Sequence, residues 1–169
     1  RVYSRTLKGR ILYGRTPAEL IREYTEYSGR MRPLPDWVHE GAIVGVQGGT
    51  ERVLTLVDRL IKEGAPLSAV WLQDWVGQRK TSFGKQLWWN WQLDRARYPE
   101  WEAMQRKLQS QGARILTYVN PFFVDVSNRG RPGRNLFAEA RDRGYLVREP
   151  NGQPYMIPNT DFSAGMLDV

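Results

Sequence analysis

The chain has 169 residues, of which 41% are hydrophobic and 25% are charged, which is typical of a folded domain and excludes a disordered segment. It contains no apolar run of about 18 residues, so it encodes no transmembrane helix and we expect no membrane partner. The net charge is +7, but basic residues alternate with acidic ones, as in Arg141-Asp142-Arg143, so we expect a solvated basic surface and no nucleic acid partner.

The first 35 residues predict strands, one helix and a joint. Residues 1–14 alternate well enough between apolar and polar positions for one or two short strands. A helix follows, because Thr16 is a suitable N-cap, Pro17 suits the first helical position, Glu19 completes a capping box and Gly29 provides an end. The proline-rich stretch RPLPDW comes next, and it indicates a domain boundary.

After this joint, short apolar strands alternate with amphipathic helices. We expect strands at residues 41–46, 67–72, 113–123 and 164–169. We expect one helix with Thr50 as its N-cap, one that Pro99 opens and one with Asn135 as its N-cap, and a hairpin that turns at Asn151-Gly152. This alternation indicates a parallel sheet in an α/β fold, either an open doubly wound sheet or part of a barrel. No glycine-rich nucleotide-binding motif follows the first strand, which disfavours nucleotide binding.

Metal and redox chemistry are disfavoured by the same sequence. It contains no cysteine, which excludes disulfides and thiolate metal sites, and His39 is its single histidine, so we expect no metal and no cofactor. A cysteine-free chain fits a reducing compartment, and we expect a cytoplasmic protein. Because the chain begins with Arg1 and ends in the apolar run GMLDV, we expect it to be part of a larger protein.

Ligands of parallel α/β folds bind at the carboxyl ends of the strands. The residues at these ends are Gln47-Gly48-Gly49, Gln73-Asp74-Trp75, Asn120-Pro121-Phe122 and Asp168. The connection after the second predicted strand runs from residue 74 to 98, whereas such loops usually have about two to six residues. A connection of this length at the functional end predicts a binding element.

The stretch WLQDWVGQRKTSFGKQLWWNW, residues 71–91, combines tryptophans with amides, an aspartate and basic residues. Sugars present apolar C–H faces that stack on tryptophan and hydroxyls that need polar partners, so the composition favours sugar binding. Alternatives remain for individual residues: Trp71 and Trp91 as core anchors, and Asp74 as a turn or cap residue. A platform for single-stranded nucleic acid is a rival use of the same aromatic residues.

The order of several segments resembles glycoside hydrolase family 31. The pieces that carry the resemblance are VWLQDW, YPEWEAMQRKLQSQGARILTYVNPFF, GYLVREPNGQPY and GMLDV. That family contains retaining α-glucosidases, α-xylosidases and sulfoquinovosidases, in which a β-sandwich precedes a (β/α)8 barrel. The resemblance implies that residues 1–35 are the end of the sandwich with its connecting helix, and that residues 36–169 are the first, incomplete part of the TIM barrel.

Within that family the segment QDWVGQRKTSFGK is most similar to sulfoquinovosidases. The similarity implies that Asp74 binds sugar hydroxyls in the −1 subsite and that Gln73 and Trp89 lie near the substituent at C6. Gln86 stands where the similar enzymes have an arginine for the sulfonate, and a neutral amide does not replace a charge-assisted contact to an anion. The expected substrate-binding residues are Gln73, Asp74, Trp75, Gln86 and Trp89.

No catalytic residue is expected within the chain. The family's nucleophile is an aspartate in a motif resembling K-x-D-F-G-E, and Asp161-Phe162 echoes this motif without its lysine or its Gly-Glu. The sequence therefore predicts part of a retaining α-glycoside hydrolase that acts on α-glucoside-type substrates, with the isolated chain inactive. Two alternatives stay open: a sulfoquinovosidase with an altered sulfonate site, and a non-catalytic carbohydrate-binding protein.

Overall fold

The structure, a computed structural model, describes residue 6, residues 8–130 and residues 133–169. Contacts divide the chain into two units, Arg1–Pro35 and Asp36–Val169.

The first unit contains helix α1 (Pro17–Ser28), which confirms the helix expected there. The Thr16 side chain accepts a hydrogen bond from the backbone N–H of Glu19 at 3.2 Å. The Glu19 carboxylate accepts from the backbone N–H of Arg15 at 2.7 Å, so it closes the capping box one residue earlier than expected. Residues 8–14 form no strand, so the expected strands are wrong there. Of the earlier residues only Thr6 is described.

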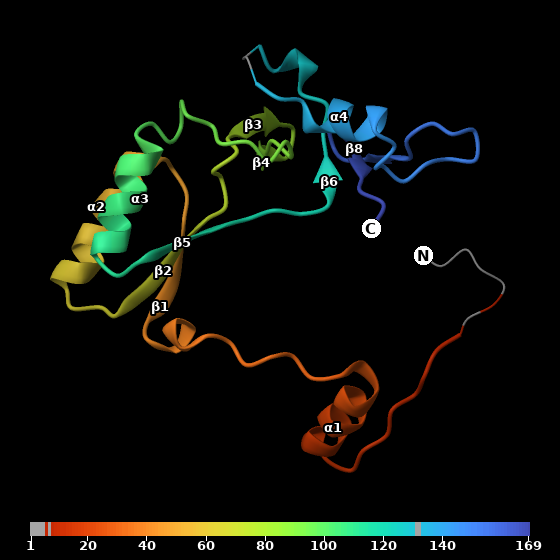
Figure 1. The fold of residues 1–169 in the computed structure, drawn as a ribbon, viewed down its shortest axis with the longest axis horizontal. Helices are drawn as coiled ribbons and strands as arrows, with labels where there is room; N and C mark the ends of the chain where they lie inside the picture. The colour runs from red at the N-terminus through yellow and green to blue at the C-terminus, as the bar shows by residue number, and fades with distance from the viewer. Residues whose placement is uncertain (1–5, 7, 131–132) are drawn as a thin grey trace. The chain divides into compact units, whose positions relative to one another are not determined.

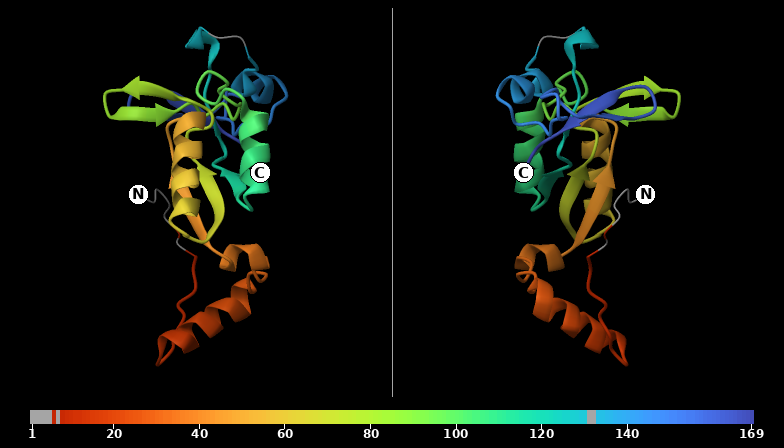
Figure 2. Two further views of the ribbon diagram at one scale, coloured as in Figure 1. Left: turned by 90° about the vertical axis from the view of Figure 1, so that its left-hand side faces the viewer. Right: turned by 90° about the vertical axis from the view of Figure 1, so that its right-hand side faces the viewer.

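The second unit is built on a parallel sheet with strand order β1-β2-β5. The strands are β1 (Ala42–Val46), β2 (Leu67–Leu72) and β5 (Arg114–Thr117), and the 3-10 helix η1 (Asp36–His39) precedes β1. Helices α2 (Thr50–Lys62) and α3 (Trp101–Ser110) lie side by side against one face (Figures 1 and 2). The core between helices and sheet contains Val53, Val57, Val70, Leu72, Met104 and Leu108, all of which are buried. The expected strands 41–46 and 67–72 are thus confirmed.

Helix α2 begins differently from the expectation. Its N-cap is Gly49, and Thr50 is the first helical residue, so Thr50 as N-cap was wrong. Gly49 has φ 93°, and a Cβ there would collide with the backbone oxygen of Arg97, so glycine is required. The Thr50 hydroxyl instead donates to the backbone oxygen of Pro99 at 2.7 Å. This bond ties the start of α2 to the segment before α3.

The last part of the chain forms a second, antiparallel sheet with strand order β6-β8-β7. Its strands are β6 (Phe122–Phe123), β7 (Met156–Pro158) and β8 (Ser163–Met166). The expected strand 113–123 is therefore two strands, β5 and β6, in different sheets. The expected fourth parallel strand at 164–169 was wrong, because β8 pairs antiparallel with both of its neighbours. Asp168 consequently does not lie at the end of a parallel strand.

The connection between β6 and β7 contains the 3-10 helix η2 (Ser127–Arg129) and helix α4 (Leu136–Asp142). As expected, the side chain of Asn135 caps α4, accepting from the N–H of Ala138 at 3.2 Å. The expected turn at Asn151-Gly152 also forms, with Gly152 at φ 82° and its N–H donating to the Glu149 oxygen at 2.8 Å.

The tryptophan-rich connection after β2 contains a hairpin of β3 (Gln78–Thr81) and β4 (Gly84–Leu87), so it is not irregular throughout. The backbone N–H and the hydroxyl of Ser82, at the hairpin's turn, donate to the Asp161 carboxylate at 2.5 and 2.7 Å. Figure 1 shows the hairpin and the β6-β8-β7 sheet beyond the carboxyl ends of the parallel strands. This is the end at which the sequence predicted a binding element.

We expect Gly77→Ala to lower the free energy of unfolding by at least ~2 kcal/mol. Gly77 connects the end of β2 to the hairpin with φ 79°, where an alanine is strained. Its Cβ would lie 2.9 Å from Nη2 of Arg129 and even closer to the Asp94 carboxylate, so it would push this ion pair apart. Urea denaturation of the purified protein measures the loss.

Gly84→Ala is the matched control. Gly84 also has a positive φ, 97°, but a Cβ there meets no atom of the described residues within 4 Å. We expect a loss of only about 1 kcal/mol, from the backbone conformation alone. Equal losses in the two variants would contradict the role assigned to the contact between Gly77 and the ion pair.

Candidate functional site

A pocket of about 290 Å³ lies at the carboxyl ends of β1 and β2, against the hairpin. Amide side chains line much of it: Gln47, Gln73, Gln78, Gln86 and Asn159. The other lining residues are Lys85, Leu87, Trp89 and Tyr118. We call this the amide pocket. It brings together Gln73, Gln86 and Trp89 of the five expected substrate-binding residues.

Three glutamines of the amide pocket form a hydrogen-bonded chain. The side-chain nitrogen of Gln78 donates to Oε1 of Gln47 at 3.1 Å, and the nitrogen of Gln47 donates to Oε1 of Gln73 at 2.6 Å. These residues come from β3, from the end of β1 and from the end of β2. The chain therefore fixes the hairpin to the sheet and directs the amide nitrogen of Gln73 as a donor at its end.

Trp89 forms one wall of the amide pocket and is held by two aromatic rings. Its ring stacks on Phe122 with 5.5 Å between centroids, and it forms a T-shaped pair with Phe162 with 5.4 Å between centroids. The neighbouring Trp88 lies against Arg79 and Arg129 instead and does not line the pocket. The two adjacent tryptophans therefore point to different surroundings, as expected for an extended segment.

Asp74 lies outside the lining of the amide pocket and is fully buried. One carboxylate oxygen accepts from the Tyr98 hydroxyl. The other accepts from Nε of Arg97 and from the backbone N–H of Gly48, the latter at 3.0 Å. Burial, together with the bond to Asp74, raises the pKa of the Tyr98 hydroxyl far above its usual range, so it stays a donor. This carboxylate joins the end of β2 to the end of β1 and to the segment before α3.

Trp75, another expected binding residue, also lies outside the lining of the amide pocket. It packs against the core beneath the sheet, and its ring nitrogen donates to the backbone oxygen of Tyr118 at 2.8 Å. The structure thus places Trp75 as an anchor between the ends of β2 and β5. Asn120 stays near this point, donating to the Tyr118 hydroxyl at 3.1 Å.

Arg79 stands opposite Gln86 in the hairpin but does not line the amide pocket. Its guanidinium lies 3.5 Å from the ring centroid of Phe162 and 4.5 Å from that of Trp88, and it donates to the Leu87 oxygen at 3.3 Å. Burial, with a smaller contribution from Arg129, lowers the pKa of Arg79 to about 10, so it remains charged at neutral pH. Arg79 therefore stabilises the hairpin through these contacts, outside the amide pocket.

Three lining residues of the amide pocket were not predicted from the sequence: Gln78, Tyr118 and Asn159. Tyr118 directly follows β5, so the rule about strand ends could have found it. Gln78 belongs to a hairpin that was expected to be a loop. Asn159 comes from the connection between β7 and β8, far along the chain, and no signal in the sequence connects it to the others.

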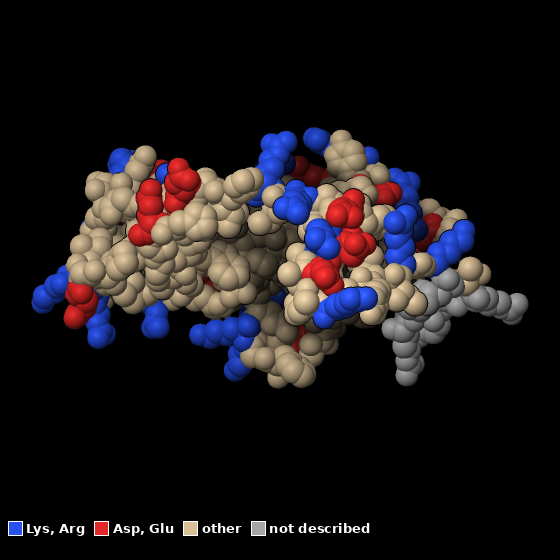
Figure 3. All heavy atoms as spheres, turned by 90° about the horizontal axis from the view of Figure 1, so that it is seen from below, with Lys and Arg blue, Asp and Glu red and all other residues tan. Residues whose placement is uncertain are grey.

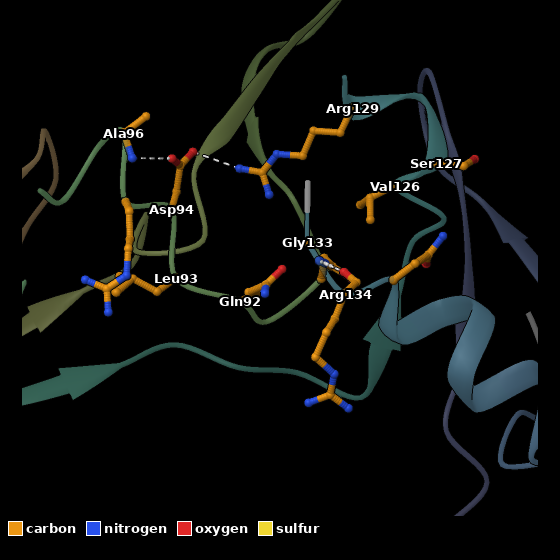
Figure 4. Close-up of a pocket in the computed structure, with 12 residues that line it drawn as sticks. Gln92, Leu93, Asp94, Ala96, Val126, Ser127, Arg129, Gly133 and Arg134 are labelled. Atoms are coloured by element: carbon orange, nitrogen blue, oxygen red, sulfur yellow. Dashed lines mark hydrogen bonds and ion pairs between the residues drawn. The ribbon is translucent and has the colours of Figure 1, made fainter. Parts of the chain in front are cut away.

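A second pocket, of about 690 Å³, lies between residues 90–96 and the segment that contains η2. Figure 4 shows Arg129 reaching toward Asp94, which it meets at 2.8 Å, while Asp94 also accepts from the N–H of Ala96 at 3.1 Å. These bonds connect η2 to the connection before α3. No residue of this pocket was an expected binding residue.

Surface charge, possible metal ligands and helix length bear on the other partners considered from the sequence. Figure 3 shows one face of the molecule, on which lysine and arginine are interspersed with aspartate and glutamate rather than gathered in one patch. Among the described residues no three histidine, cysteine, aspartate or glutamate side chains cluster as a metal site would require. No helix in the described ranges is long and apolar enough to cross a membrane.

Comparisons with known proteins agree on one family. The family model described as "Glycosyl hydrolases family 31 TIM-barrel domain" matches residues 34–169. A sulfoquinovosidase of Agrobacterium fabrum is 35% identical over 152 residues, which cover 89% of this chain and 22% of the relative. A sulfoquinovosidase of Escherichia coli is 32% identical over 154 residues, which cover 91% of this chain and 22% of the relative. The chain thus spans about a fifth of the length of these curated relatives.

One solved structure extends the comparison to the backbone. A family 31 sulfoquinovosidase from E. rectale, in complex with the aza-sugar inhibitor IFGSQ, superimposes with a TM-score of 0.75 at 37% sequence identity. The match covers 88% of this chain and 21% of that one.

Proposed function

Since the chain belongs to glycoside hydrolase family 31, we propose that it is the first part of the barrel of a retaining α-glycoside hydrolase that acts on α-glucoside-type substrates. Strands β1, β2 and β5 are parallel neighbours in chain order, which is the arrangement of successive strands in a (β/α)8 barrel. The end of a preceding β-sandwich within residues 1–35 and a cytoplasmic location belong to the same proposal.

The observation that supports this function most directly is the amide pocket. Its described lining combines five amide side chains with the rings of Trp89 and Tyr118 and contains no carboxylate. Amides donate and accept hydrogen bonds at once, as sugar hydroxyls do, and aromatic rings suit the C–H faces of a sugar. The pocket also lies at the end of the sheet where ligands of barrel enzymes bind.

In this proposal Gln73 and Trp89 contact the sugar near its C6 substituent, and Gln86 contacts the same region from the hairpin. Asp74 supports the pocket from behind, and it would contact sugar hydroxyls directly only by exchanging one of its protein partners. The nucleophile and the acid/base carboxyl group, which retaining enzymes hold about 5 Å apart, come from the rest of the barrel. Asp161 is engaged by Ser82 and serves to hold the hairpin.

The test is hydrolysis by the intact enzyme that contains this chain. We expect it to cleave para-nitrophenyl α-glucoside with retention, so that nuclear magnetic resonance detects the α-anomer of the released sugar first. Residues 1–169 alone should show no turnover, because the carboxyl pair is missing. Inversion at the anomeric carbon, or turnover by the isolated chain, would contradict the proposal.

Two other functions make different predictions in the same assays. A sulfoquinovosidase with an altered sulfonate site should cleave α-sulfoquinovosides faster than α-glucosides, and the similarity to two sulfoquinovosidases favours testing it. A non-catalytic carbohydrate-binding protein should bind sugars without any turnover.

A further inference from the structure

Gln86 has a buried acceptor that no group of the described residues satisfies. Its Oε1 is buried and receives no hydrogen bond from the described residues, although the side chain lines the amide pocket. Buried polar atoms in folded proteins almost always have a partner, and an orphan costs stability. An acceptor of this kind at a pocket wall points to a ligand that donates a hydrogen bond there.

Gln73 presents the complementary group in the same pocket. Its Oε1 is occupied by the amide nitrogen of Gln47 at 2.6 Å, and this bond leaves its own amide nitrogen to act as a donor. Gln73 and Gln86 both line the amide pocket. A hydroxyl group donates one hydrogen bond and accepts another, so it matches this donor and acceptor together. A sulfonate or carboxylate only accepts, and its oxygens would face the acceptor of Gln86.

The positively charged side chains near the amide pocket do not offset this preference for a hydroxyl over an anionic group. Lys85 is the one charged residue among the described lining residues, and its side chain is exposed. Arg79 points its guanidinium at Phe162, Trp88 and the Leu87 oxygen instead of the pocket. An exposed ammonium group attracts an anion only weakly, because water and salt screen it.

We propose that Gln86 makes the amide pocket selective for an uncharged sugar that carries a hydroxyl at C6, and that it disfavours an anionic group at that position. The inference rests on the proposed function and narrows its substrate class to neutral α-glucosides. It assigns to Gln86 the choice between a hydroxyl and an anion, and to Gln73 the matching donor.

The experiment compares three α-glycosides of para-nitrophenol in the intact enzyme: the glucoside, the 6-deoxyglucoside and the sulfoquinovoside. We expect the 6-deoxy compound to lose ~10-fold in kcat/KM relative to the glucoside, because Gln86 then stays unpaired. Gln86→Met should make this difference smaller, because only the hydrogen bond from Gln73 then still depends on the hydroxyl. Gln86→Arg should shift the ratio of sulfoquinovoside to glucoside by ~100-fold toward the sulfoquinovoside, through charge-assisted bonds. Gln105→Arg, at an exposed position on α3, adds the same charge and should leave the ratio unchanged.

Sugar binding distinguishes the proposed hydrolase function from the selectivity proposed for Gln86. The affinities of methyl α-glucoside and methyl α-sulfoquinovoside are measured calorimetrically, with melting curves to confirm that each variant is folded. Preference for the glucoside without any turnover would contradict the hydrolase and support the selectivity. Turnover with preference for the sulfoquinovoside, or a ratio that Gln86→Arg does not move, would overturn the selectivity and leave the hydrolase standing. Failure to bind or cleave either sugar would overturn both.

Discussion

Replacing Asp74 with alanine should lower the free energy of unfolding by about 3–5 kcal/mol and remove most activity of the intact enzyme. The carboxylate is fully buried and accepts from Tyr98, Arg97 and Gly48. Its removal leaves the buried Tyr98 hydroxyl and the Gly48 N–H without their acceptor, and it frees the Arg97 guanidinium, whose side chain is 29% exposed. The ends of β1 and β2 would then separate, and the amide pocket lies across these two ends. Chemical denaturation and kcat/KM measure the two losses.

The control for Asp74→Ala is Asp58→Ala. Asp58 pairs with Lys107 at 2.6 Å, but both side chains are about half exposed, at 48% and 42%. An ion pair in such surroundings contributes little to stability, because water and salt screen it, so we expect little change in stability or activity. If Asp74→Ala kept its stability and lost only activity, Asp74 would have to contact the substrate directly, as the resemblance to the family first implied.

Tyr98→Phe tests whether the hydrogen bonds around Asp74 stabilise the fold cooperatively. This variant removes one donor to Asp74 but leaves the buried ring in the core. We expect the loss in Asp74→Ala, Tyr98→Phe together to be smaller than the sum of the single losses, because both changes break the same bond. Additive losses would show that the Tyr98 hydroxyl and Asp74 stabilise the fold independently.

The parallel sheet and its helices could be predicted from the sequence, because the pattern that identifies each element is formed by residues close together in the chain. The apolar runs of β1 and β2 and the one-faced patterns of α2 and α3 follow from spacing alone. The β3-β4 hairpin could not be predicted from the sequence, because its residues QRKT and GKQL are almost all polar and do not alternate between polar and apolar. The antiparallel placement of β8 was also missed, since it depends on pairing with β6 and β7 rather than on its own residues.

For the candidate site, composition predicted the kind of residue but not its orientation. Gln73, Gln86 and Trp89 were named from sequence and line one pocket, whereas Asp74 and Trp75 lie outside its lining. The burial of Asp74 depends on Arg97 and Tyr98, which lie at the other end of the long connection. No pattern among neighbouring residues predicts such a hydrogen-bond network. The position of Trp75 depends likewise on the backbone oxygen of Tyr118. Long-range hydrogen bonds therefore decide which polar residues of this loop remain available to a ligand.

Trp89→Ala should reduce kcat/KM of the intact enzyme for α-glucosides by roughly 100-fold, equivalent to ~2.7 kcal/mol of transition-state stabilisation. Trp89 is a wall of the amide pocket, and its stacking on Phe122 and its edge contact with Phe162 fix that wall in place. Its removal takes away the apolar surface for the sugar and lets the sugar shift relative to the catalytic carboxyl groups, and small displacements of this kind cost about two orders of magnitude. Steady-state kinetics with para-nitrophenyl α-glucoside measure the effect.

Trp88→Ala separates this local effect from a general loss of packing. Trp88 is adjacent in sequence and similarly half-buried, but it lies against Arg79 and Arg129 and outside the amide pocket. We expect Trp88→Ala to lower the melting temperature, because the half-buried Arg79 loses one of its two aromatic partners, while kcat/KM falls much less than in Trp89→Ala. The two variants are compared at one temperature, below the unfolding transitions of both. Equal losses of kcat/KM would mean that the hairpin as a whole, and not the Trp89 wall, determines how the sugar is held. The difference between the two variants therefore measures what the orientation of one ring contributes, since type, burial and sequence position are nearly the same.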